Sequence, residues 1–216
     1  MKKSVYSLVL MDEVVDAIDQ LAYSLGTSRS QLINEILAEK VAMRTPQQQL
    51  QKLFEELSGY LSPHQQFQIQ NQAAEHMYSI KSALRYKYNP TIRYSFYINQ
   101  KQGKLEGQLR IISRTQSPVL SSYLQNFFQL WANLEVQKHP VIWQQEEGMK
   151  WLRILNLQAF ISPQNAPYLA SHLSEYIKVL DGALRLYFIQ IEKDIHVPEE
   201  IANHYMNYCK GLNLLI

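Results

Sequence analysis

Cysteine is almost missing from this chain of 216 residues, in which Cys209 is the single example. One thiol cannot form a disulfide within the chain, and this excludes the small secreted domains that disulfides hold together. Such cysteine usage suits a reducing compartment. We therefore expect the protein to lie in the bacterial cytoplasm, in association with the nucleoid.

Long apolar runs are missing too, since none approaches the ~20 residues that a helix needs to cross a bilayer. The N-terminus does not read as a signal peptide, because Lys2 and Lys3 precede a short segment that Ser7 and Asp12 interrupt. We therefore expect neither a membrane-spanning helix nor a membrane partner.

Signatures of catalysis and metal binding are absent from the sequence. It has no Gly-rich phosphate loop, no Cys-x-x-Cys pair and no His-Glu-x-x-His motif. The six histidines are scattered, and His204 and Cys209 are five residues apart instead of the four that suit a metal pair on a helix. We expect no enzymatic activity, no metal site and no cofactor.

The first forty or so residues carry the clearest pattern that is present. Residues 5–10 alternate and predict a strand, and the following segment predicts a helix from Asp12 that ends at Gly26. Thr27 and Ser28 can cap a second helix. The apolar residues expected on the buried sides of the two helices are Val14, Val15, Ile18, Leu21, Ala22, Leu25, Leu32, Ile33, Ile36 and Leu37.

A module of this size cannot bury its own apolar surface, and its strand would keep unpaired edges. The economical solution is a two-fold dimer in which two copies of the strand pair antiparallel above four helices. The segment therefore predicts a homodimer, with higher oligomers also possible.

Residues Ala22 to Ser30 follow the pattern A-x-x-L-G-x-S-R-S between the two predicted helices. Together with the strand, this resembles the ribbon-helix-helix family of bacterial DNA-binding proteins, in particular its CopG-like branch, over about 45 residues. The resemblance implies a sequence-specific transcriptional regulator, a repressor, that acts as a dimer with its strand pair in the major groove of double-stranded DNA.

The resemblance also implies roles for individual residues. The outward side chains of the strand would meet base edges, and the start of the second helix would bind a phosphate. The implied DNA-binding residues are Lys2, Lys3, Val5, Ser7, Val9, Ser28, Arg29 and Ser30. The alternate strand residues would face the helices, and these are Tyr6, Leu8 and Leu10.

Charge and side-chain chemistry keep a second hypothesis open. Residues 1–45 hold five Lys/Arg and six Asp/Glu, whereas duplex affinity depends on neutralising phosphates. Two of the three outward strand residues are valines, which offer only an apolar contact to a thymine methyl. The alternative is an interaction or assembly protein that uses the module for dimerisation alone. An antitoxin fits less well, because about 170 apolar-rich residues follow the module.

Ser/Thr-Pro pairs suggest where the remaining helices start. The predicted helices cover residues 46–57, 63–86, 118–137, 163–194 (or 167–194) and 198–211, with a β-hairpin at 91–115. Residues 141–161 are ambiguous, and we favour a short helix followed by a strand at 151–160. The predicted fold class is mainly α (α+β): a ribbon-helix-helix module at 1–44, followed by a helix-rich α+β effector or oligomerisation domain at 45–216.

Positive charge is concentrated in residues 81–115, which hold eight Lys/Arg and one carboxylate, Glu106. The predicted basic patch on the polar face of the hairpin comprises Arg93, Arg110, Arg114, Lys101 and Lys104. Three interpretations stay open. The patch can be a second nucleic-acid contact, a site for an anionic ligand or acidic protein, or a solvated face that protects an edge strand.

Overall fold

The computed structural model describes residues 5–41, 45–70, 74–87, 89–101, 104–157, 166–193 and 197–210. The chain divides into two compact units, Met1–Gln49 and Leu50–Ile216, which we call the N-terminal unit and the sheet unit. Across these ranges, no helix combines the length and the apolar character that a membrane crossing requires.

The N-terminal unit contains two helices, α1 (Asp12–Ser24) and α2 (Arg29–Lys40). Gly26 lies in the connection between α1 and α2. Its φ is +65°, a left-handed conformation that glycine adopts without steric penalty. The Ser28 hydroxyl accepts a hydrogen bond of 3.3 Å from the backbone N–H of Gln31 and so caps α2. The two predicted helices and their turn are therefore confirmed, although Met11 and not Asp12 occupies the N-cap of α1.

The strand predicted at the start of this unit is wrong. Residues 5–11 are extended, but among the described residues of the unit no strand pairs with them. A strand needs a neighbour for its backbone N–H and C=O groups, and the two helices offer none. The described part of this unit thus starts at residue 5 with an extended segment followed by α1, so a strand-first ribbon-helix-helix module does not describe this fold.

The sheet unit is built on six strands: β1 (Phe67–Ile69), β2 (Met77–Ala83), β3 (Thr91–Lys101), β4 (Lys104–Ser113), β5 (Trp143–Glu146) and β6 (Lys150–Leu155). They form one sheet in the order β1-β2-β3-β4-β6-β5, and every neighbouring pair is antiparallel. The hairpin predicted at 91–115 is present as β3 and β4.

The predicted fold class, a mainly helical protein with one hairpin, is wrong because this sheet is much larger than expected. The helix predicted at 63–86 is replaced by β1 and β2, and the short helix predicted after residue 141 is replaced by β5. The sequence of β2 alternates from Tyr78 to Ser82, which is the period of a strand. Pairing with β3 lets this alternation prevail over the helical spacing of the wider segment.

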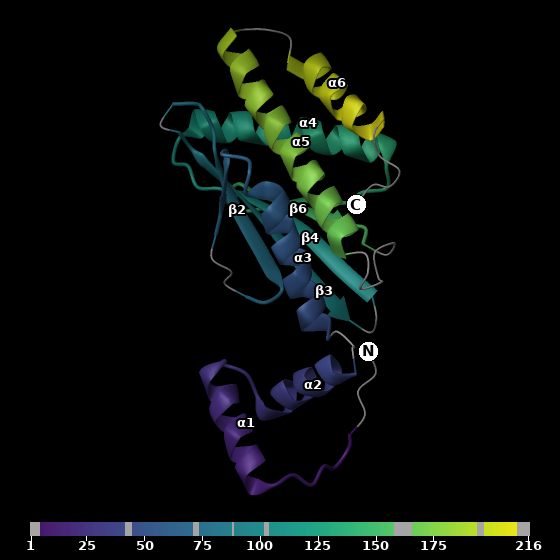
Figure 1. Ribbon diagram of the computed structural model, residues 1–216. Coiled ribbons are helices and arrows are strands. Elements are labelled where there is room, and N and C mark those ends of the chain that lie inside the picture. The colour runs from purple at the N-terminus through teal and green to yellow at the C-terminus, as the bar shows by residue number, and fades with distance from the viewer. Residues whose placement is uncertain are drawn as a thin grey trace. The chain divides into compact units, whose positions relative to one another are not determined.

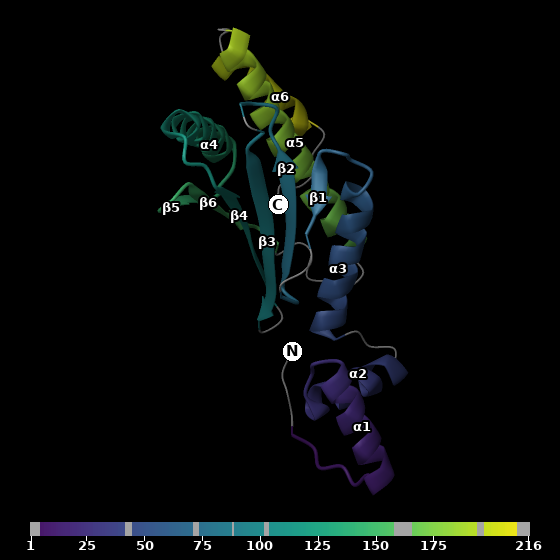
Figure 2. The same cartoon turned by 90° about the vertical axis from the view of Figure 1, so that its left-hand side faces the viewer.

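The described residues contain four further helices: α3 (Pro46–Leu61), α4 (Pro118–Lys138), α5 (Ala166–Lys193) and α6 (Val197–Lys210). The Ser117 hydroxyl accepts a hydrogen bond of 3.3 Å from the N–H of Leu120, as its position before Pro118 predicts. Figure 1 shows α3 and α5 on the same side of the sheet, and in Figure 2 α3 lies on one side of strands β1 to β3.

One face of the sheet carries the core. Side chains of antiparallel partners point to the same face, so the register aligns Ile80, Tyr94, Ile111 and Trp151 across four strands, and all four are buried. Helix α3 reaches this face through Phe54 and Tyr78, whose ring centroids are 5.6 Å apart. Helix α4 reaches it through Phe128 and Trp151, 5.7 Å apart. We call it the covered face.

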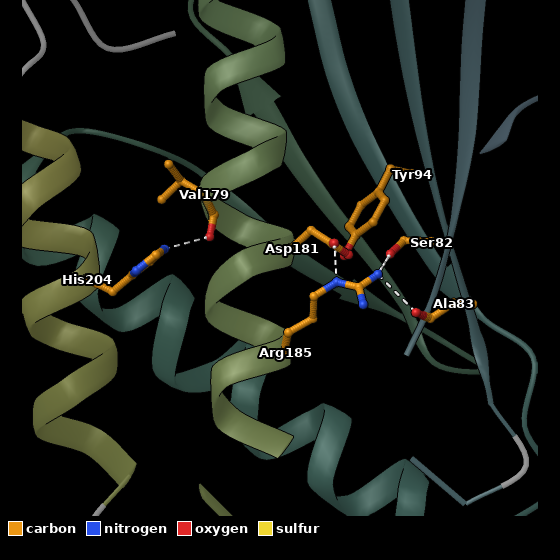
Figure 3. A network of polar contacts seen from close by, with 7 residues as sticks. All are labelled: Ser82, Ala83, Tyr94, Val179, Asp181, Arg185 and His204. Atoms are coloured by element: carbon orange, nitrogen blue, oxygen red, sulfur yellow. Dashed lines mark hydrogen bonds and ion pairs between the residues drawn. The ribbon is translucent and has the colours of Figure 1, made fainter. Parts of the chain in front are cut away.

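A polar network attaches α5 to the covered face (Figure 3). The Tyr94 hydroxyl donates a hydrogen bond of 3.0 Å to the buried Asp181 carboxylate, to which Arg185 also donates at 2.8 Å. Arg185 donates further to the Ser82 hydroxyl at 2.6 Å and to the Ala83 carbonyl at 2.9 Å. Burial raises the pKa of Tyr94 well above its usual value, and the nearby Asp181 charge raises it further.

Candidate functional site

The start of α2 carries three of the predicted DNA-binding residues. Ser28 caps the helix, and Arg29 and Ser30 follow it in the exposed first turn. The backbone N–H groups of a first helical turn and the positive end of the helix dipole favour a bound anion. The structure therefore gathers Ser28, Arg29 and Ser30 at one exposed point.

Arg29 is already engaged within the N-terminal unit. Its guanidinium donates two hydrogen bonds to the carboxylate of Asp19 on α1. These hydrogen bonds lower the pKa of Asp19, and the positive charge of Arg29 acts in the same direction. The pair joins α1 to α2 and reduces the positive charge that Arg29 would present to a phosphate.

The extended segment presents Val5, Ser7 and Val9 to solvent. Val5 and Val9 are fully exposed, at 100% and 101%, whereas Leu8 and Leu10 are 59% and 40% exposed. Tyr6 is 85% exposed, so all three residues that were expected to face the helices are themselves exposed. Lys2 and Lys3 lie outside the described residues.

Apolar side chains form much of the surface of the N-terminal unit. Among residues 5–41, Ala22 and Leu32 are the only buried apolar residues. The large exposed ones are Val5, Tyr6, Leu8, Val9, Leu10, Met11, Leu21, Tyr23, Leu25, Ile36, Leu37 and Val41. A monomeric soluble unit rarely exposes so much apolar surface, and such patches mark interaction sites.

The second candidate surface is the face of the sheet opposite the covered face, which we call the open face. Its residues alternate with the buried ones: Ser79, Lys81, Arg93, Ser95, Tyr97, Asn99, Glu106, Gln108, Arg110, Ile112, Gln144, Glu146, Lys150, Leu152 and Ile154. Most are half-buried or exposed and polar. An antiparallel sheet with one packed face and one solvated face gives this pattern.

Part of the predicted basic patch is assembled on the open face. Arg93 and Arg110 lie there, and the Arg110 guanidinium carbon is 5.2 Å from the centroid of the Tyr97 ring. Arg110 also approaches Glu146 of β5 at 4.0 Å, too far for a hydrogen bond. This stacked pair of an aromatic ring and a guanidinium is a contact that the sequence alone did not indicate.

The other members of the predicted patch lie elsewhere. Arg114 is exposed beyond the end of β4. Lys101 and Lys104 face each other as Cα partners at the hairpin turn, and their side chains lie outside the described part of the chain. Sequence reasoning missed Lys81 and Lys150, because Lys81 was assigned to a helix and Lys150 to an ambiguous segment.

A hollow with a volume of about 490 Å³ lies at the hairpin end of the open face. Its walls include Tyr97, Asn99, Gln108 and Ile154. Gly107 also borders it, and a Cβ atom at this position would lie 2.4 Å from Cδ1 of Leu157, so the Leu157 side chain would have to shift to admit it. The hollow thus combines an aromatic ring, two amides, aliphatic side chains and the carboxylate of Glu106.

A buried ion pair lies on the covered face and was also missed. Arg153 of β6 donates to Glu135 of α4 at 2.8 Å, and both side chains are fully buried. Trp143 donates to the same carboxylate at 2.6 Å, and Arg153 lies 4.6 Å from the centroid of the Tyr176 ring. The pair ties α4 to the sheet and has no access to solvent, which points to a structural role.

Metal-binding clusters are absent from the described residues. No group of three or more His, Cys, Asp or Glu side chains there could hold a metal ion. His204 contacts the Val179 carbonyl at 3.2 Å and so links α6 to α5 (Figure 3).

Comparison of the chain with protein-family models, with curated proteins and with solved structures gives no match. The resemblance to the ribbon-helix-helix family therefore stays a prediction from the N-terminal residues.

Proposed function

We propose that this protein is a homodimeric, DNA-binding transcriptional regulator whose N-terminal unit contacts double-stranded DNA. One observation carries the proposal. The unit presents the start of a helix to solvent, beside an apolar surface that it cannot bury by itself. The apolar surface supports a dimer, and the helix start supports a phosphate contact.

A second copy of the chain is the occupant that suits the apolar surface. The exposed apolar residues come from the extended segment, α1 and α2, so two copies related by a two-fold axis can cover the same residues on each other. Each Å² of apolar surface removed from water contributes about 25 cal/mol. Two copies of the unit together also approach the chain length at which a hydrophobic core can stabilise a fold.

DNA is the ligand that suits the rest of the unit. The first turn of α2 offers N–H groups and the Ser30 hydroxyl to a phosphate, which positions a protein on a duplex. The exposed segment with Val5, Ser7 and Val9 supplies side chains for base edges, of which Ser7 can hydrogen-bond. Sequence preference is therefore expected to depend most on Ser7.

The pair between Asp19 and Arg29 provides a sharp test of this contact. Asp19→Asn removes a negative charge and releases Arg29 for a phosphate. We expect tighter duplex binding and a plot of log K against log salt steeper by about 0.9, the value for one added phosphate contact. The duplex is first obtained by selecting bound genomic fragments, and affinity is then measured by mobility shift.

Glu39→Gln is the matched control, because it makes the same charge change on an exposed residue at the far end of α2. We expect a smaller effect on the salt dependence. Equal effects of the two variants would mean that the start of α2 is not a contact point. Absence of saturable duplex binding at low salt would overturn the proposed function.

The dimer is tested separately by sedimentation over a range of protein concentrations. Leu37 is exposed within one chain, so Leu37→Ser should leave a monomer unaffected but shift a dimer towards monomers. A chain that stays monomeric at micromolar concentration would contradict the dimer.

An assembly protein that dimerises without binding DNA is the second candidate. It is favoured by the engagement of Arg29 with Asp19, which leaves the module little free positive charge. A stable dimer that fails to bind any selected duplex would support this candidate instead.

A further inference from the structure

Three cations on the open face lie in a single line across the sheet. The register pairs Lys81 of β2 with Arg93 of β3, Arg93 with Ile112 of β4, and Ile112 with Lys150 of β6. The row ends at the carboxylate of Glu146 on β5, the Cα partner of Lys150. Neighbouring strands are about 4.8 Å apart, so this line extends over roughly 14 Å. Among the described residues, no ion pair involves Lys81, Arg93 or Lys150.

This spacing distinguishes between kinds of anion. A small anion is held by cations that converge on one point. Lys81, Arg93 and Lys150 are instead spread over a width of four strands. A line of separated positive charges matches a chain of phosphates, which binds by neutralisation at successive positions. A polynucleotide is therefore the ligand that this charge pattern fits.

The neighbouring rows of the open face suit a nucleic-acid base. On the open face, Arg110 lies in the row of side chains next to the line of cations, and Tyr97 lies in the row after that. The Tyr97 ring and the guanidinium stacked on it are both planar groups on which bases stack. The Nε of Arg110 has no hydrogen-bond acceptor among the described residues. The hollow of about 490 Å³ begins at Tyr97, and the amides of Asn99 and Gln108 in its wall can pair with the edge of a base.

We propose that the open face of the sheet binds single-stranded nucleic acid. Its phosphates lie along Lys81, Arg93 and Lys150, and a base stacks at Tyr97 and Arg110 at the mouth of the hollow. A single strand fits better than a duplex, because its bases are free to stack on a sheet surface whereas those of a duplex are already paired. The site lies in the sheet unit and is independent of the proposed duplex contact in the N-terminal unit.

The test uses the full-length protein and a fluorescent single strand of fifteen thymidines, with affinity measured by anisotropy. Tyr97→Ala is expected to lower the affinity about fivefold or more, since stacking is worth 1–3 kcal/mol per base. Tyr97→Phe keeps the ring and should retain most of the affinity. Loss of affinity in both variants alike would contradict stacking at this position.

The charge line is tested by the double variant Arg93→Ser/Lys150→Ser. Removal of two phosphate contacts should lower the slope of log K against log salt by about 1.4 for a single strand. The matched control is Lys138→Ser/Lys210→Ser, which removes two exposed lysines at the ends of α4 and α6. This control should bind like the unchanged protein, and circular dichroism checks that all variants are folded.

Several results would overturn the proposal. They are absence of saturable single-strand binding at low salt, an equal loss in the Lys138/Lys210 control, and tighter binding of a duplex than of the single strand at the open face. Competition by a mononucleotide as effective as that by the strand would also overturn it, in favour of a small-molecule site. The open-face variants should leave the effect of Asp19→Asn on duplex binding unchanged, which keeps this test separate from that of duplex binding.

Discussion

Individual residues hold the sheet unit together through buried charges. Asp181 and Arg185 join α5 to β2 and β3, and Glu135 joins α4 to β6 through Arg153. A buried charge is tolerated only when it is paired and hydrogen-bonded, because burial removes its hydration. These contacts therefore specify where the two helices lie on the sheet more than they add to stability.

Arg185→Met tests this at the residue scale. The substitution leaves the fully buried Asp181 carboxylate without its cation, and we expect the free energy of unfolding to fall by about 3–5 kcal/mol. Urea unfolding followed by circular dichroism measures the change.

Lys178→Met is the control on the same helix. Lys178 pairs with the half-exposed Glu175, and the loss of such a pair should cost less than about 1 kcal/mol. A similar loss of stability in both variants would show that the buried position of Asp181 has no special effect.

At the scale of elements, the backbone conformation of glycine decides how a helix continues or ends. Gly26 follows α1 with a φ of +65°, which side-chain-bearing residues rarely adopt. Gly59 lies within α3, which continues to Leu61 and so extends beyond the predicted end at residue 57. Gly26 therefore needs a positive φ that alanine disfavours, whereas Gly59 lies in a helix, where alanine is favoured.

Opposite effects of alanine are predicted at these two sites. Gly59→Ala meets no atom within 4 Å and should stabilise the sheet unit by about 0.4–1 kcal/mol, because alanine restricts the unfolded chain. Gly26→Ala should destabilise the N-terminal unit by about 1 kcal/mol, because its φ is unfavourable for alanine. Scanning calorimetry of each variant measures both effects, and the same sign at both positions would contradict the assignment.

For the whole molecule, buried tyrosines link stability to pH. Fourteen tyrosines occur in the sequence, and burial raises the pKa of Tyr78, Tyr94, Tyr176, Tyr187, Tyr205 and Tyr208 above the usual 10.0. These phenols keep their protons in the folded state at a pH at which the unfolded chain releases them. Their contribution to stability is therefore complete below pH 10 and is lost as the pH rises above it.

We predict that the free energy of unfolding falls steeply above pH 10, by up to about 1.4 kcal/mol per pH unit for each buried tyrosine. Tyr94→Phe should reduce this slope, because it removes one of the phenols that must ionise on unfolding. Tyr23→Phe, at an exposed position of α1, should leave it unchanged. Urea unfolding at pH 8 to 11 measures the slopes, and a flat profile above pH 10 would contradict the prediction.

The sequence could predict those features of the fold that neighbouring residues in the chain specify. Helix α4 was predicted within a residue at each end, since Ser117 and Pro118 start it and apolar residues repeat along it. The hairpin of β3 and β4 was also predicted, because apolar and polar residues alternate over most of its length. These features depend on residues close together in the chain.

The extra strands, the buried ion pairs and the line of cations could not be predicted in this way. Strands β2 and β5 pair with edges that β3 and β6 offer, and β1 pairs in turn with β2. Such pairing joins residues whose local pattern is ambiguous. Lys81 and Lys150 lie 69 positions apart in the sequence and become aligned only through the register of four strands.

The sequence by itself determined the helical hairpin of the N-terminal unit, the β3–β4 hairpin and the excess of positive charge around it, because propensity, capping and alternation act over a few residues. Only the tertiary structure decided that the sheet has six strands, which face is packed, and which cations share the open face. The physical reason is that strand pairing and burial depend on residues brought together from distant parts of the chain.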